Sequence, residues 1–116
     1  MTRATITIAA GNQYSNPDHA KTETVEAELI TNGMLGLAVH RVYNPTGHEL
    51  YRWVVTHVPT GLQVSAFRLK RQAREYAVRI GDLPVPWATI HNRTDALAVD
   101  MDLRNQIAAI RQEYKP

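Results

Sequence analysis

The sequence contains no cysteine, only one phenylalanine and only two serines. Without cysteine the chain has no disulfide, no thiolate metal ligand and no cysteine nucleophile, and it suits a reducing compartment. Neither Ser15 nor Ser65 lies in the context of a nucleophile elbow, where glycines flank a catalytic serine. These absences remove several common classes of enzyme.

Long apolar runs and glycine-rich motifs are also missing. No stretch approaches the roughly 18 apolar residues of a membrane-spanning helix, and neither a Walker-type loop nor a Gly-x-Gly-x-x-Gly pattern occurs. Thr5 and Thr7 interrupt the apolar N-terminal run, which favours a strand over a signal peptide. We therefore expect a soluble, cytoplasmic protein that is not an enzyme, binds no cofactor or metal and contacts no membrane.

What is present is the composition of an ordinary globular protein. The 116 residues are 44% hydrophobic and 21% charged, which is typical of one folded domain. We expect that domain to span residues 1–116, with a sheet over 4–67, a basic helix over 68–80, an extended proline-containing link over 82–93 and a C-terminal helix over 95–114.

Alternating polar and apolar residues predict the strands. They are residues 4–9, a segment from Thr22 to the turn at 32–33, and residues 34–43, 50–58 and 62–67. Asn32-Gly33 is a strong hairpin signal, and Pro-Thr-Gly recurs in the turns that end at Gly47 and Gly61. In the last strand we expect Leu62, Val64 and Ala66 to share one face.

Helical spacing follows the last strand. An apolar stripe predicts the basic helix, and its members are Leu69, Ala73, Tyr76, Ala77 and Ile80. Gly81 is expected to end that helix, and Thr94 to cap the second one. Trp87, in the link between them, is expected to pack over a core edge or to form a ledge for a partner.

Strands grouped before helices predict an α+β fold, an antiparallel β-meander of four to five strands with one or two helices packed on one face. The order of elements over residues 22–81 is similar to that in transcription-coactivator-like single-stranded DNA-binding proteins. This resemblance concerns element order alone, and no functional residue is carried over from it.

Charge is concentrated in the middle of the chain. Residues 41–81 carry seven cations and two acids, whereas the segments on either side are mildly acidic. Lys70, Arg71 and Arg74 are predicted to share the helix face opposite the apolar stripe. Like charges at this spacing destabilise a helix slightly, and phosphate groups would convert that cost into a gain.

The sequence therefore predicts a module that binds a nucleic-acid backbone. The candidate binding residues are Arg52, Trp53, Arg68, Lys70, Arg71 and Arg74. In this hypothesis the cations contact phosphates, while Trp53 or Tyr51 stacks on bases.

Four alternatives remain open. The basic helix could present a solvated face on which Arg71 pairs with Glu75, or it could meet an acidic protein surface. The protein could instead be a protein-interaction or regulatory module, homo-oligomeric and of the kind that mobile elements carry. The protein could also be an enzyme with an acid–base site formed by His57 and Glu49. In a related arrangement, His40 and His57 would meet across the sheet, and Glu49 would complete a site of metal-ligand type.

Overall fold

The computed structural model describes residues 2–10, 21–30, 36–42, 51–91, 94–95 and 98–114. The predicted turns at 32–33 and 44–47 lie outside these ranges. Within them the chain forms β1 (Thr2–Ala10), β2 (Lys21–Leu29), β3 (Leu37–Arg41), β4 (Trp53–His57), β5 (Leu62–Phe67), α1 (Lys70–Gly81), the short 3-10 helix η2 (Trp87–Thr89) and α3 (Met101–Gln112).

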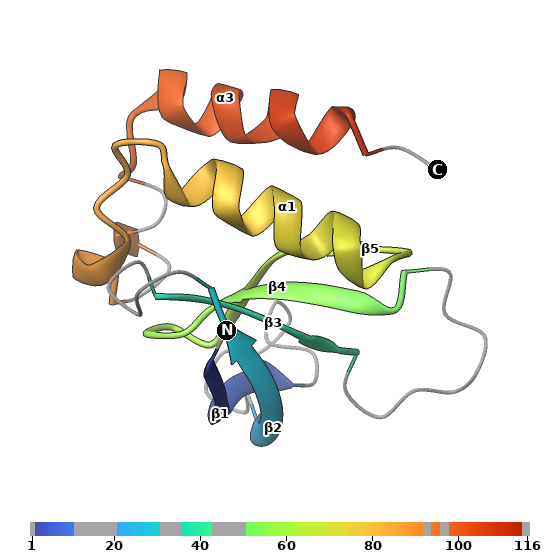
Figure 1. The fold of residues 1–116 in the computed structure, drawn as a ribbon. Helices are drawn as coiled ribbons and strands as arrows, with labels where there is room; N and C mark the ends of the chain where they lie inside the picture. The colour runs from blue at the N-terminus through green and yellow to red at the C-terminus, as the bar shows by residue number, and fades with distance from the viewer. Residues whose placement is uncertain are drawn as a thin grey trace.

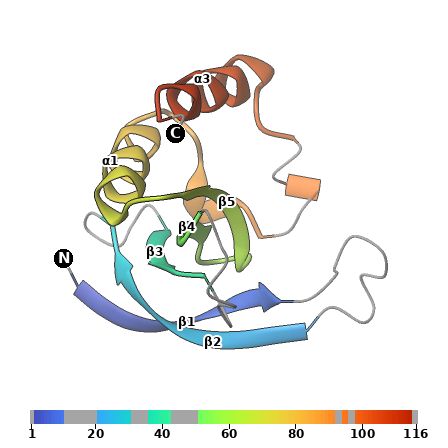
Figure 2. The same cartoon turned by 90° about the vertical axis from the view of Figure 1, so that its right-hand side faces the viewer.

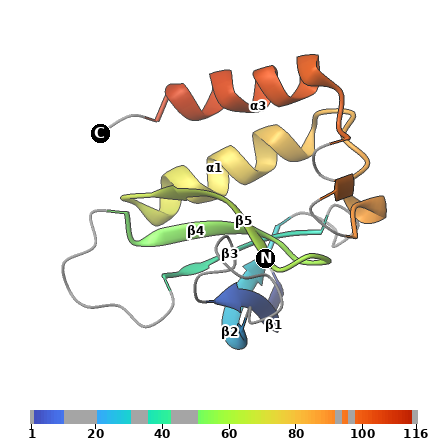
Figure 3. The ribbon, with the colours of Figure 1, turned by 180° about the vertical axis from the view of Figure 1, so that it is seen from behind.

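All five strands pair antiparallel in their sequence order, β1-β2-β3-β4-β5, and form one meander. The two α-helices run in opposite directions on one side of the sheet, with α1 between the sheet and α3 (Figures 1 and 3). The predicted α+β fold is therefore confirmed. Among the described residues, no helix is both long enough and apolar enough to cross a membrane.

The main core lies between α1 and the sheet. Tyr76 and Ile80 of α1 are at most 1% exposed. They belong to one buried cluster with Ala73, Ala77, Val39, Val55 and Phe67. The predicted stripe is confirmed except for Leu69, which is 51% exposed because it precedes the helix as the N-cap residue.

A second, smaller core lies on the opposite side of the sheet. The β1–β2 hairpin curves beneath β3, β4 and β5, and β1 comes close to β5 (Figure 2). The enclosed cluster consists of Ile6, Ile8, Ala27 and Ala38. His40 and Thr56 are also buried, and they are joined by a 2.7 Å hydrogen bond between Nε2 and Oγ1.

The predicted face of β5 is wrong at Ala66, because the strand contains a bulge. Val55 pairs with Ser65, while Thr56 pairs with Gln63, so Val64 is the extra residue. One extra residue reverses the alternation beyond it. Ser65 and Phe67 therefore lie on the helix side, and Ala66 does not share a face with Leu62.

The C-terminal helix begins later than predicted. Residues 94 and 95 are helical, but α3 starts at Met101. Its N-cap is Asp100, whose carboxylate accepts a hydrogen bond from the Asp102 amide. Trp87 is only 6% exposed and belongs to the main core, so it forms no ledge for a partner.

Candidate nucleic-acid interface

The antiparallel register gathers basic residues at one end of the sheet. Arg41 pairs with Trp53, and Trp53 pairs with Phe67, so these three form one row across the sheet. Arg52 and Arg68 are the next residues outward along the chain, and α1 begins with Lys70 and Arg71. We call Arg41, Arg52, Arg68, Lys70 and Arg71 the cationic end. The row joins segments that are distant in sequence, and Arg41 was not among the predicted site residues.

Two of the predicted phosphate contacts are engaged within the protein. Arg74 donates from Nε and Nη2 to Glu28 of β2, at 2.9 Å to Oε2 and 2.8 Å to Oε1, and Lys70 pairs with the same carboxylate. The Glu28 side chain is only 12% exposed. The Lys70 hydrogen bond, together with those of Arg74, outweighs burial and lowers the pKa of the Glu28 carboxyl.

This contact changes the interpretation of the basic helix. The repulsion between Lys70 and Arg74 is offset by Glu28, which approaches from a strand more than 40 residues earlier. A forked arginine–carboxylate contact is a strong, directional interaction that positions a helix on a sheet. Arg74 therefore has a structural role, which the sequence hypothesis did not include.

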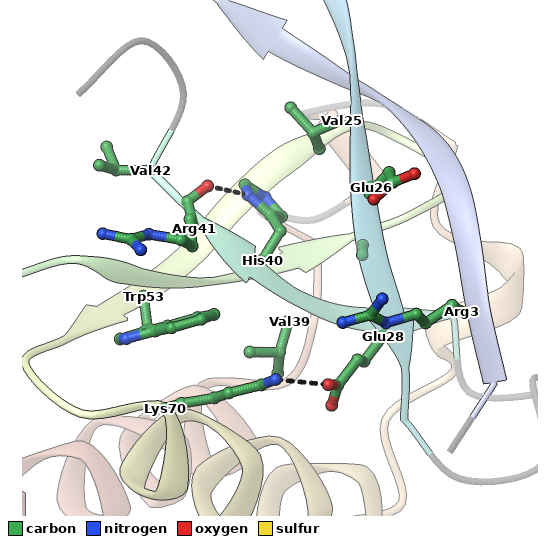
Figure 4. Close-up of a pocket in the computed structure, with 11 residues that line it drawn as sticks. Arg3, Val25, Glu26, Glu28, Val39, His40, Arg41, Val42, Trp53 and Lys70 are labelled. Atoms are coloured by element: carbon green, nitrogen blue, oxygen red, sulfur yellow. Dashed lines mark hydrogen bonds and ion pairs between the residues drawn. The ribbon is translucent and has the colours of Figure 1, made fainter.

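Trp53 offers no open ring face for base stacking. The guanidinium of Arg41 lies 5.5 Å from the centre of its ring, and the ammonium of Lys70 lies 5.2 Å from it. Figure 4 shows these two cations on opposite sides of the ring. Tyr51 is 37% exposed and lies 5.8 Å from the Arg111 guanidinium, so the second predicted stacking residue also faces a cation.

A pocket of about 410 Å³ adjoins the cationic end between β2, β3 and α1 (Figure 4). Its walls include Val25, Val39 and Val42, with Trp53 and Lys70 at the helix side. The charged groups around it are Arg3, Glu26, Glu28, Arg41 and Lys70. Arg3 is the cross-strand neighbour of Glu28, and sequence reasoning did not select it because only the register brings it there.

Arg68 and Arg71 are exposed cations of this region. Neither forms an ion pair with any residue that the structure describes, and the proposed Arg71–Glu75 pair is not among the described contacts. The first turn of α1 contains no acidic residue, and the Leu69 side chain provides no cap. The positive end of the helix dipole therefore adds to the field of these arginines.

Two further cations, Arg79 of α1 and Arg111 of α3, serve the fold. Arg79 pairs with Glu113 at 2.8 Å. Arg111 donates to the Ser65 hydroxyl and to the Ala66 carbonyl, each at 2.8 Å. Both contacts fasten α3, so neither arginine is part of the candidate interface.

The histidines do not form the hypothesised pair. His40 bonds to Thr56 inside the curled sheet, whereas His57 bonds to the Trp87 carbonyl at 2.6 Å on the helix side. Burial lowers the pKa of both imidazoles. Glu49, the third member of that hypothesis, lies outside the described residues.

No group of three or more His, Asp or Glu side chains in the described part of the chain could hold a metal ion. Comparison with known proteins gave no relative: no family model, curated protein or solved structure matches the chain. The geometry of the cationic end is therefore the basis for any functional argument.

Proposed function

We propose that the protein binds the phosphate backbone of a nucleic acid at the cationic end. The observation that carries this proposal is that Arg41 of β3, Arg71 of α1 and Arg68, directly after β5, lie at one end of the sheet. All three side chains are exposed. Convergent cations raise the local concentration of a polyanion, and each phosphate they neutralise releases counterions.

The charges around Lys70 also support an anionic partner. The only acidic residue in direct contact with Lys70, among the residues described, is Glu28, and it is already shared with Arg74. The three groups together keep one net positive charge. Arginine suits this role because its fork can bind two phosphate oxygens at once.

Backbone contact without base stacking predicts weak dependence on sequence. Cations lie over both ring faces of Trp53, so this residue does not serve as an aromatic platform of the kind that single-strand binders use. We therefore expect similar affinities for oligonucleotides of different sequence, with a strong dependence on salt.

The test is fluorescence anisotropy with a labelled single-stranded oligonucleotide over a series of salt concentrations. Three arginine contacts predict a slope of log K against log salt of about −2. The double substitution Arg68→Gln and Arg71→Gln should reduce the steepness by about 1.4. Binding that is insensitive to salt, or absent for both DNA and RNA, would contradict the proposal.

A matched control keeps the net charge change constant. Asn105→Glu with Gln106→Glu also lowers the charge by two, at exposed positions on α3. The control should retain the wild-type slope, because both positions precede Arg111, the residue through which α3 reaches Tyr51 and Phe67 near the cationic end. Poly-glutamate is the second probe: if it binds as tightly as the oligonucleotide, the surface recognises an acidic protein instead.

A further inference from the structure

A second pocket, of about 210 Å³, lies beneath the N-terminal half of α3 and apart from the cationic end. Its walls come from the end of β4, from β5, from the link and from α3. Seven of its lining residues are apolar: Leu62, Val64, Val85, Trp87, Ile90, Val99 and Ile107. The bulge at Val64 contributes to this lining, since it adds a residue to β5 at this point.

The lining contains few polar groups, and they differ in whether they already have a partner within the protein. His57 has both ring nitrogens engaged, with the Trp87 carbonyl at 2.6 Å and with the Thr60 hydroxyl at 2.9 Å. Arg104 is exposed and forms no ion pair with a described residue. No acidic residue of the described part lines the pocket. Among the described lining residues, the charge available to a ligand is therefore that of the Arg104 guanidinium.

The contacts that anchor α3 lie outside the pocket, at the opposite end of the helix from the half that covers it. Arg111 is bonded to Ser65 and Ala66 and lies 4.4 Å from the centre of the Phe67 ring. Tyr114 packs edge-on against that ring. These contacts all lie at the C-terminal end of α3, whereas Val99, Arg104 and Ile107 cover the pocket. Ligand atoms could thus gain apolar contacts without displacing the anchors.

We infer that this pocket binds a small aromatic carboxylate. An apolar cavity of about 150 Å³ is enough for benzene, so the present volume has room for a ring and a short acidic arm. The carboxylate would pair with Arg104 at the rim. The buried indole Nε1–H of Trp87 lacks a hydrogen-bond partner among the described residues, and a ligand oxygen that reached it would satisfy it.

Tryptophan fluorescence provides a direct measurement, because the chain has only two tryptophans. In the variant Trp53→Phe the remaining emission comes from Trp87, which lines the pocket. Phenylacetate should change that emission saturably, and the uncharged phenylacetamide should bind about tenfold more weakly. Binding of neither compound at millimolar concentration would overturn the inference, as would equal affinity for the acid and the amide.

Variants test the charged contact and the apolar cavity separately. Arg104→Gln in this background should remove the preference for the acid and leave binding of the amide unchanged. Val99→Phe should fill the pocket and abolish binding of both compounds. Gln106→Ala, at an exposed position of the same helix that does not line the pocket, should behave as the background does.

Two checks keep the result interpretable. Circular dichroism should show that Val99→Phe retains the helices; if it unfolds, Ile107→Phe fills the same pocket from the next turns of α3 and replaces it. Light scattering should show that the protein forms no dimer through this pocket, that is, no dimer that is lost in the variant Val99→Phe. Such a dimer would assign the pocket to a second copy of the chain and overturn the proposal.

Discussion

The two α-helices have the same length but are held to the rest of the molecule by different means. Both contain twelve residues. α1 has five buried residues, and it contacts β3, β4 and β5. α3 has no fully buried residue and is fastened by Arg111, Glu113 and Tyr114 near its C-terminal end. The comparison shows that α1 is part of the core. α3 is an outer element that packs on the core through the half-buried Leu103, Ile107 and Ile110, and its polar anchors lie near its C-terminal end.

Arginine has a different role in each setting. Arg74 and Arg111 place the helices on the sheet through directed hydrogen bonds. Arg71 extends from α1 and has no ion-pair partner among the described residues. Charge alone therefore does not identify a binding residue, because the partner of each guanidinium decides its role.

The largest expected effect tests the difference in burial. Ile80→Ala should lower the free energy of unfolding by about 3 kcal/mol, because Ile80 of α1 is fully buried in the main core. Ile107→Ala should lower it by only about 1 kcal/mol, because Ile107 is half-buried. Urea denaturation of both variants measures the difference. Equal losses would show that α3 is packed as firmly as α1.

The second effect concerns the charged contact of α1. Glu28→Gln should lower the free energy of unfolding by about 2 kcal/mol, because it leaves Lys70 and Arg74 without their carboxylate. Glu26→Gln, at an exposed position of the same strand, should change it by less than about 0.5 kcal/mol.

The pKa of Glu28 adds a pH dependence to this prediction. Its pKa is lowered in the folded protein, so the stabilisation is present above the unfolded-state pKa and is lost as the pH falls through the folded value. The wild type should therefore lose more stability on acidification below about pH 4.5 than Glu28→Gln does. Parallel pH profiles for the two proteins would contradict the assigned contact.

A smaller effect tests the anchor of α3. Arg111→Met keeps much of the apolar stem but removes the bonds to Ser65 and Ala66, which should cost about 1 kcal/mol. Hydrogen exchange should become faster in α3 and stay unchanged in α1. Gln112→Ala, an exposed neighbour on α3, is the control.

The smallest expected effect on stability concerns His57, which joins β4 to the link between α1 and α3. The His57 ring bonds to the Trp87 carbonyl, and burial lowers the pKa of the imidazole. A histidine whose folded pKa is depressed binds its proton more readily when unfolded, so stability should fall as the pH drops below about 6.5. His57→Gln should flatten this part of the pH profile, leaving the similar contribution of the buried His40.

The sequence predicted the fold well because its signals there are local. Alternation and helical spacing depend on neighbouring residues, so the β5 range and the α1 stripe, apart from Leu69, were predicted correctly. The bulge at Val64 was missed because it arises from pairing with β4 and leaves no separate pattern in β5. The later start of α3 was missed because Thr94 and Asp100 are both good caps, and packing decides between them.

The candidate site was less predictable. Arg41 joins Arg68 and Arg71 only through the register of three strands. The pairing of Arg74 with Glu28 likewise depends on where α1 crosses β2. Composition can locate a basic segment, but it does not show which of its charges the fold neutralises.

Because each strand pairs with the next one in sequence, the sheet topology has a consequence for the folding pathway. Hairpins between consecutive strands close short loops and can form within microseconds, whereas contacts between distant segments close later. The Glu28–Arg74 contact joins residues 46 positions apart. We therefore expect it to form after the transition state, so that Glu28→Gln accelerates unfolding and leaves the folding rate nearly unchanged.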